Sequence, residues 1–199
     1  MLTNVLSDVL RRYTDKDCGF AKHQLFLYSL VIGMNAKNVF EFGSGDSTLT
    51  ILQALDQTDG KLISCDIEGG RGPLKLSKFF EQNTDWDCSR WNLVLKNSKH
   101  IEEILSEHAK GIVFDLILHD GSHTGDIVLH DLQTIVPMMK KNAILIVHDT
   151  QHKANFGLLK RCRSVMSPYK HSMTTLPYGC GLTIIRMESD LGNGKVKVV

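Results

Sequence analysis

Apolar residues follow two different spacings along this chain, and the two spacings predict strands that are separated by helices. Short, nearly continuous apolar runs predict buried strands at 38–42, 61–66, 91–96, 114–119 and 143–147. Apolar residues three and four positions apart predict helices at 47–56, 73–83, 99–109, 124–140 and 155–166. Strands that alternate with helices form parallel sheets, because each connection has to cross from one end of the sheet to the other.

Further elements are expected before the first strand and after the last of these helices. Apolar stripes predict leading helices at 2–13 and 21–34. Two runs at 171–176 and 180–186, around a Pro-Tyr-Gly turn, predict paired strands that close the sheet. We therefore expect an α/β fold: a doubly wound, Rossmann-like sheet of seven mostly parallel strands, with helices on both faces and an antiparallel last strand.

The length of 199 residues favours a single domain. In this interpretation residues 1–37 are leading helices and residues 38–187 are the core. Residues 188–199 are expected to form a mobile tail, because this segment carries two glycines and alternating lysines.

A tight glycine turn follows the first predicted strand. Gly43 lets the chain turn sharply, and Gly45 lets the backbone approach a ligand without an intervening Cβ. A strand, a glycine turn and a helix form the half-unit that binds nucleotide-like cofactors in doubly wound folds. The dinucleotide fingerprint needs a third glycine, and Thr48 stands at that position instead.

Two acidic residues accompany this turn. Glu41 lies in the strand just before it, where a carboxylate would repel a pyrophosphate but attract a cationic amino group. Asp66 ends the second strand, 21 residues after Gly45, which is where doubly wound folds place a carboxylate on the ribose hydroxyls. The two motifs are independent of each other, and both favour a nucleoside-containing cofactor.

The fourth and fifth strands also end in polar residues. The fourth is followed by Asp120-Gly-Ser-His123, and the fifth ends in His148-Asp149-Thr150. Ligands of open α/β sheets bind beyond the carboxyl ends of the strands, near the switch point between the first and fourth strands. We therefore expect Asp120, His148 and Asp149 to converge near the cofactor.

Composition narrows the possible partners. A formal net charge of +1 and the lack of a long basic run give no reason to expect nucleic acid. The apolar stretch 25–32 is too short to span a bilayer, and the first residues do not resemble a signal peptide. Five scattered cysteines without a C-x-x-C pair indicate reduced thiols in a cytoplasmic protein. The leading helices could form a homo-oligomer contact.

The glycine turn with its preceding acid resembles the first motif of class I S-adenosylmethionine (SAM) methyltransferases. The segment Phe114 to His123, the pair Asp131-Leu132 and the strand end His148-Asp149-Thr150 are similar to a branch of metal-assisted O-methyltransferases. That branch includes macrolide-sugar O-methyltransferases and cephalosporin-hydroxylase-like proteins. The resemblance covers roughly residues 36–185 and implies SAM as cofactor, with transfer of a methyl group to a hydroxyl of a small molecule.

The resemblance also implies roles for individual residues. The cofactor-binding set would be Glu41, Gly43, Ser44, Gly45, Ser47, Asp66, Asn97, Ser98 and Asp120. In the family, the acid before the turn anchors the aminoacyl end of the ligand, and the polar residue after the third strand, here Asn97, faces the adenine. Asn97 and Ser98 are also suited simply to cap the following helix. His123, three residues after Asp120, corresponds to the proposed general base.

By the same resemblance Asp120, His148 and Asp149 would hold a divalent metal, Mg²⁺ or Mn²⁺. His148 departs from the pattern, because better-studied members carry a carboxylate there. Mg²⁺ prefers oxygen ligands, whereas imidazole suits softer metals. The site therefore takes a softer metal, binds Mg²⁺ weakly or has lost the metal, and the sequence leaves these alternatives open.

Two other functions remain as alternatives. A non-catalytic SAM-binding or scaffold protein would keep the same cofactor motifs. An NAD(P)-dependent oxidoreductase would need the third glycine and a Tyr-x-x-x-Lys or similar group for hydride chemistry, and the sequence has neither.

Overall fold

A twisted sheet forms the centre of the molecule. The computed structural model describes residues 7, 9–11, 14, 20–152, 157–177 and 180–189. Over these residues the sheet has seven strands in the order β3-β2-β1-β4-β5-β7-β6. They are β1 (Asn38–Phe42), β2 (Lys61–Asp66), β3 (Trp91–Leu95), β4 (Phe114–His119), β5 (Met139–His148), β6 (His171–Leu176) and β7 (Leu182–Met187). Neighbours from β3 to β5 pair in parallel, whereas β7 runs antiparallel to both β5 and β6. The predicted fold class is confirmed.

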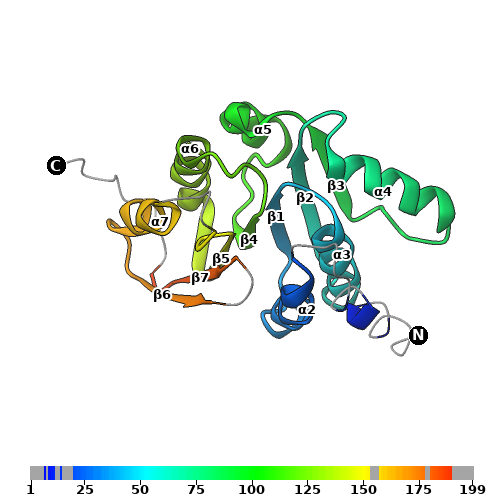
Figure 1. The fold of residues 1–199 in the computed structure, drawn as a ribbon, viewed down its shortest axis with the longest axis horizontal. Coiled ribbons are helices and arrows are strands. Elements are labelled where there is room, and N and C mark those ends of the chain that lie inside the picture. Colours follow the sequence, from blue (N-terminus) through cyan, green and yellow to red (C-terminus); the bar gives the residue numbers. More distant parts are fainter. Residues whose placement is uncertain are drawn as a thin grey trace.

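Helices cover both faces of this sheet (Figure 1). They are η1 (Ala21–His23), α2 (Gln24–Gly33), α3 (Asp46–Thr58), α4 (Arg71–Gln82), η2 (Ser98–His100), α5 (Ile101–His108), α6 (Gly125–Ile135), η3 (Val136–Met138) and α7 (Leu158–Met166). In Figure 1, α5, α6 and α7 lie along one face, α2 and α3 along the other, and α4 lies beyond β3.

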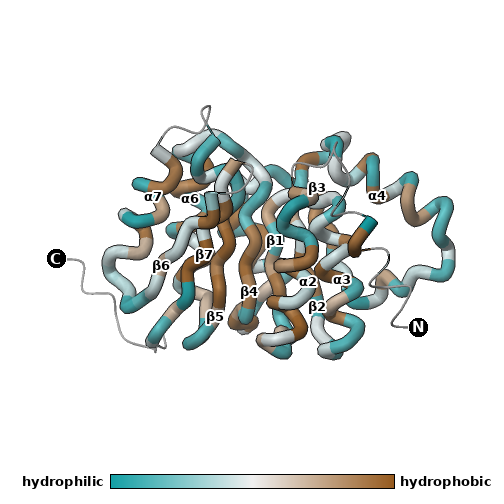
Figure 2. The backbone as a smooth tube through the Cα atoms, turned by 60° about the horizontal axis from the view of Figure 1, so that its bottom comes forward, coloured by the Kyte–Doolittle hydropathy of each residue, from teal (hydrophilic) through white to brown (hydrophobic). Residues whose placement is uncertain are grey.

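Two apolar cores fill the space between the sheet and its helices. The first joins β4 and β5 to α5, α6 and α7, and the second joins the same strands to α2 and α3. The central strands are hydrophobic along most of their length, as Figure 2 shows for β4, β5 and β7. Burial on both faces explains why these strands read as continuous apolar runs in the sequence. No helix within the described part of the chain is long and apolar enough to cross a membrane.

The helix predicted at 124–140 is too long, and the strand predicted at 143–147 is too short. Pro137 lacks an amide hydrogen and cannot continue the helical hydrogen bonds, so α6 ends at Ile135 and the 3-10 turn Val136–Met138 follows. β5 begins already at Met139, which pairs with Phe114. Asn142 has φ 63° and lies within β5, at the irregular part of its pairing with β4.

Some sequence predictions reach beyond the described residues. Of the helix expected at 2–13, residues 7 and 9–11 are described and helical. The start of the helix expected at 155–166 falls outside them, and α7 covers the remainder. The tail from 190 onward also lies outside the described residues.

Candidate active site

A cavity of about 660 Å³ lies at the carboxyl ends of the parallel strands. With one exception, every residue that the sequence assigned to the site lines it. These are Gly43, Ser44, Gly45, Ser47, Asp66, Asn97, Ser98, Asp120, His123, His148 and Asp149. The exception is Glu41, which lies beneath the cavity wall and is fully buried. Parallel strands bring residues together here that are far apart in sequence, because their carboxyl ends meet at one edge of the sheet.

The glycine turn forms one wall of the cavity. Gly43 has φ 82°, and a Cβ there would lie 2.6 Å from the backbone oxygen of Asp120. The turn therefore packs directly against the end of β4, an approach that a glycine permits. Gly45 has φ 157°, and a Cβ built on it would have no atom of the described structure within 4 Å. The backbone of Gly45 is therefore open to the cavity, so a ligand could approach it closely.

Asp66 is fixed against the same turn. Its Oδ2 accepts hydrogen bonds from the backbone N–H of Ser44 at 2.8 Å and from the Ser44 hydroxyl at 2.7 Å. Its Oδ1 accepts from the backbone N–H of Ile67 at 2.7 Å. The first turn of α4 closes over this pair, since a Cβ on Gly72 would lie 1.9 Å from the Ser44 carbonyl oxygen. The carboxylate is therefore held in one orientation at the cavity wall.

Glu41 organises the start of α3 from below. Ser47, Thr48 and Ser64 each donate a hydroxyl hydrogen bond to its carboxyl oxygens, at 2.6, 2.7 and 2.8 Å. Burial raises the pKa of Glu41 from 4.5 to about 7; the three hydrogen bonds lower it, and the charge of Asp120 adds to the rise. A direct contact between Glu41 and the cofactor stays a prediction, because Ser47 lies between this side chain and the cavity.

Asn97 and Ser98 border the cavity after β3. The Asn97 side chain accepts a hydrogen bond of 2.9 Å from the backbone N–H of Lys99, so it caps η2. Its amide NH₂ group is not used in that bond. The Ser98 hydroxyl donates to Asp131 at 2.9 Å. Asn97 therefore caps the following helical turn, one of the two roles that the sequence left open. Both Asn97 and Ser98 also line the cavity.

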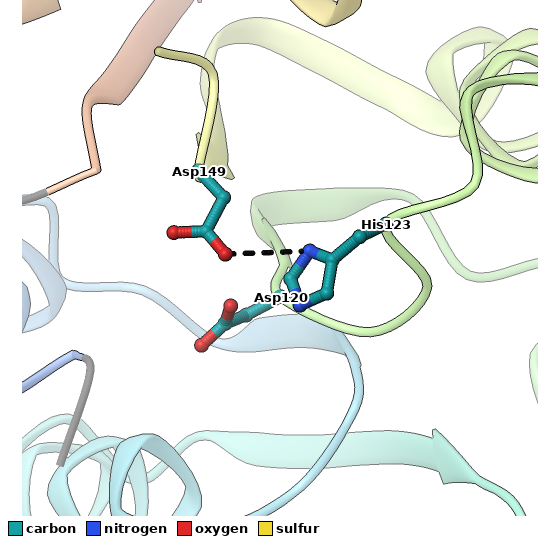
Figure 3. A group of neighbouring side chains, drawn as sticks. All are labelled: Asp120, His123 and Asp149. Atoms are coloured by element: carbon teal, nitrogen blue, oxygen red, sulfur yellow. Dashed lines mark ion pairs between the residues drawn. The ribbon is translucent and has the colours of Figure 1, made fainter. Parts of the chain in front are cut away.

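Asp120, His123 and Asp149 come together at the ends of β4 and β5 (Figure 3). One ligand atom from each lies within 4.8 Å of the other two. His123 Nδ1 is 3.4 Å from Asp149 Oδ2, and the His123 side chain is 49% exposed, so a substrate can reach it. Asp149 has φ 57°, which is uncommon for a residue other than glycine. Such left-handed conformations cluster at functional sites.

His148 lies behind these carboxylates and not beside His123. Its Nδ1 is 2.8 Å from Asp120 Oδ1 and 3.2 Å from Asp149 Oδ1. The ring edge packs against Phe20, with ring centroids 5.0 Å apart, and the side chain is 5% exposed. Burial lowers the pKa of His148, but the hydrogen bond to Asp120 and the charges of both carboxylates outweigh it and raise this pKa. Direct ligation of a metal by His148 stays a prediction.

Several residues line the cavity that the sequence did not single out. They include Phe20, Asp46, Cys65, Arg71, Lys75, Ile127 and Cys180. Lys75 of α4 forms an ion pair with Asp46 at the start of α3, across the glycine turn. Arg71 and Lys75 could have been found from the sequence, because both stand in the first turns of the helix that follows Asp66. Cys180 comes from the segment before β7, and no local pattern marks it.

Comparison with known proteins identifies the family. Residues 40–150 match the model of a family described as a methyltransferase domain, which is more than half of the sequence. The chain therefore belongs to this methyltransferase family. The matched segment begins in β1 and ends just after Asp149, so it contains the glycine turn, Asp66 and the three clustered side chains. No curated protein sequence matches the chain significantly.

Solved structures show the same fold at low sequence identity. An O-methyltransferase from Bacillus cereus in complex with S-adenosylhomocysteine (SAH) has a TM-score of 0.68 at 14% identity, over 94% of this chain and 90% of that one. An SAH-bound methyltransferase from Podospora anserina has a TM-score of 0.67 at 15% identity, over 94% and 88%. A methyltransferase from Geobacter sulfurreducens has a TM-score of 0.61 at 17% identity, over 84% and 79%.

Proposed function

We propose that this protein transfers the methyl group of SAM to a hydroxyl oxygen of a small molecule. The observation that carries the proposal is the position of His123. This half-exposed imidazole faces two carboxylates in the same cavity that the glycine turn lines. The similar Bacillus cereus protein is an O-methyltransferase that binds SAH, which supports both the cofactor and the acceptor atom.

The glycine-turn half of the cavity suits the cofactor. Asp66, whose two oxygens are anchored to backbone N–H groups, would accept hydrogen bonds from the ribose hydroxyls. Asn97 and Ser98 would border the adenine. Ser47, held from below by Glu41, would lie near the aminoacyl end, where the ionised form of Glu41 would favour an ammonium group. When bound, SAM supplies a methyl group on a positively charged sulfur.

The His123 half of the cavity suits the acceptor. A hydroxyl oxygen that attacks a methyl carbon has to lose its proton, and His123 is placed to take it. Asp149 lies against Nδ1 of His123, so it would orient the ring and stabilise the imidazolium that forms. The oxygen–carbon bond forms as the carbon–sulfur bond breaks, and the electron pair stays on sulfur. Alignment of the oxygen with that bond supplies much of the rate.

A methyl-transfer assay tests the proposal. The protein is incubated with SAM carrying a labelled methyl group and a panel of phenols, catechols and sugar alcohols. We expect label in an ether product, and we expect His123→Ala to lower kcat about 100-fold or more while SAH affinity is unchanged. His130→Ala, on the exposed side of α6, is the matched control. Label found only on nitrogen or sulfur, or an unchanged kcat for His123→Ala, would contradict the proposal.

A divalent metal at Asp120, His123 and Asp149 is a second candidate for the same site. Two carboxylates and one imidazole within 4.8 Å of one another fit such an ion. The nitrogen ligand favours Mn²⁺ over Mg²⁺. His148 would orient both carboxylates from behind, as hydrogen-bonded neighbours of metal ligands do. A bound metal would supply positive charge that favours loss of the hydroxyl proton.

Calorimetric titration with Mn²⁺ tests the metal site separately. We expect binding to the unaltered protein, loss of binding in Asp149→Asn and in His123→Ala, and unchanged binding in Asp126→Asn. Asp126 is an exposed acid of α6 and serves as the control. Absence of Mn²⁺ binding by folded protein would overturn the metal proposal and leave proton transfer by His123 alone.

A further inference from the structure

A buried polar network lies directly behind the wall of the cavity, between β4 and α6. His119 is 2% exposed and Asp131 is fully buried, and His119 Nε2 lies 3.0 Å from Asp131 Oδ2. The same Oδ2 accepts the hydrogen bond of 2.9 Å from the hydroxyl of Ser98. One carboxylate oxygen thus joins a strand, a helix and the cavity-lining turn after β3.

The network also contacts a second part of the cavity wall. The ring of His119 stacks on the ring of Phe42, with centroids 4.7 Å apart and an angle of 29° between the planes. Phe42 lines the cavity and immediately precedes the glycine turn. His119 therefore supports the wall at Phe42, and Asp131 fixes Ser98 relative to it.

Packing alone does not explain the carboxylate of Asp131. Its Oδ1 has no hydrogen-bond partner among the described residues, and His130 Nδ1 lies 3.9 Å from it, beyond hydrogen-bonding distance. A buried carboxylate with a vacant oxygen is costly compared with an apolar residue of similar size. A charged group persists at such a position where its strong hydrogen bonds hold other residues in place.

We infer that the Asp131–His119 pair is a positioning element for the adenine end of the cofactor cavity. Asp131 holds the Ser98 hydroxyl and with it the Asn97–Ser98 backbone, while His119 holds Phe42 in the adjoining wall. Neither residue lines the cavity, so neither touches the ligand. The inference rests on the proposed function, because it assigns the adenosine half of SAM to this part of the cavity.

Binding of SAH and of adenosine, measured by calorimetry, tests the inference. We expect Asp131→Asn and Ser98→Ala each to weaken both ligands by about five- to twentyfold, a loss equivalent to one charge-assisted hydrogen bond. The double variant should be no weaker than the worse single variant, because both changes remove the same contact. Ser98→Thr keeps the hydroxyl and should weaken both ligands less than Ser98→Ala does.

Two matched variants separate positioning from general damage. Asp126→Asn changes another acid of α6 and should leave both affinities unchanged. Ser47→Ala alters the part of the cavity that the proposed function assigns to the aminoacyl end, and it should weaken SAH but not adenosine. If Asp131→Asn does not fold, Ser98→Ala and Ser98→Thr still decide the question, because both leave Asp131 and His119 in place.

Failure of the inference differs from failure of the proposed function. Unaltered, folded protein that binds neither SAH nor adenosine would overturn both. If the unaltered protein binds both ligands, then normal affinity in Ser98→Ala and in folded Asp131→Asn would overturn the inference alone. Independent, additive losses in the two variants would also overturn it.

Discussion

His148 and Asp120 lie at the ends of adjacent parallel strands and are joined by a hydrogen bond of 2.8 Å between Nδ1 and Oδ1. The same ring nitrogen lies 3.2 Å from Asp149 Oδ1. One buried imidazole thus lies between two carboxylates that would otherwise repel each other across the active site. His148 therefore holds Asp120 and Asp149 in place from the buried side, and His123 faces them from the solvent-exposed side.

Removal of this imidazole should destabilise the fold. We expect His148→Ala to lower the free energy of unfolding by about 1–3 kcal/mol, because two partly buried carboxylates lose their shared partner. In the His148→Ala background, Asp120→Asn should cost less than it costs alone, since it removes the repulsion. Denaturant titrations of the four proteins in this cycle give the coupling directly. Strictly additive effects would show that the hydrogen bond does not couple the two residues.

Glu41 should make stability depend on pH. Its pKa is raised by burial from 4.5 to about 7, so its favourable contribution is complete below about pH 4.5 and is lost as the pH rises through 7. Glu41→Gln lacks this ionisation. Relative to that variant, the unaltered protein should lose on the order of 2–3 kcal/mol between pH 5 and pH 8.5. Denaturant titrations at several pH values measure this, with exposed Glu81→Gln as control. Parallel pH profiles for Glu41→Gln and unaltered protein would contradict the prediction.

Gly72 should be required for the close approach of α4 to the glycine turn. A Cβ at this position would lie 1.9 Å from the Ser44 carbonyl oxygen and 2.9 Å from Asp66 Oδ2, so the helix start has to move. We expect Gly72→Ala to weaken SAH binding at least tenfold and to cost about 1–3 kcal/mol of stability. Gly33→Ala, where a Cβ meets no described atom within 4 Å, should leave SAH affinity unchanged and cost no stability. Unchanged SAH affinity in Gly72→Ala would show that this contact does not shape the cofactor site.

Asp66 should distinguish a ribose from a deoxyribose. Its anchored carboxylate is expected to accept hydrogen bonds from both ribose hydroxyls, so adenosine should bind about tenfold more tightly than 2′-deoxyadenosine. Asp66→Ala should abolish this preference, and Glu68→Ala, two residues further on, should keep it. Competition against SAH measures both ratios. If the unaltered protein and Asp66→Ala show the same ratio of adenosine to 2′-deoxyadenosine affinity, Asp66 does not bind the ribose.

Much of the fold could be predicted because buried parallel strands leave a strong local signal. The bounds of β1, β2 and β4 agree with the predicted runs, and the glycine turn and Asp66 follow from where those strands end. The end of α6 was missed although Pro137 marked it, because apolar periodicity continues through the 3-10 turn into β5. The role of Met139 as a strand residue depends on pairing with Phe114, a contact distant in sequence.

The arrangement of the site was less predictable. The sequence placed Asp120, His148 and Asp149 at one edge of the sheet, but the left-handed backbone of Asp149 decides which way its carboxylate points. With that conformation both carboxylates meet His123 on the open side and His148 on the buried side. The partnership of His119 with Asp131 depends on the packing of α6 against β4, a contact that no local pattern in the sequence marks.

Calorimetric titration of SAH into the protein in the presence of EDTA tests the central claim most directly. The proposed cofactor site consists of the glycine turn, Asp66 and the turn after β3, and none of these needs a metal. We therefore predict micromolar binding with one site per chain, with at least tenfold weaker binding in Asp66→Ala. Absence of binding by folded protein, both in EDTA and with added Mn²⁺, would contradict the assignment of this cavity to SAM.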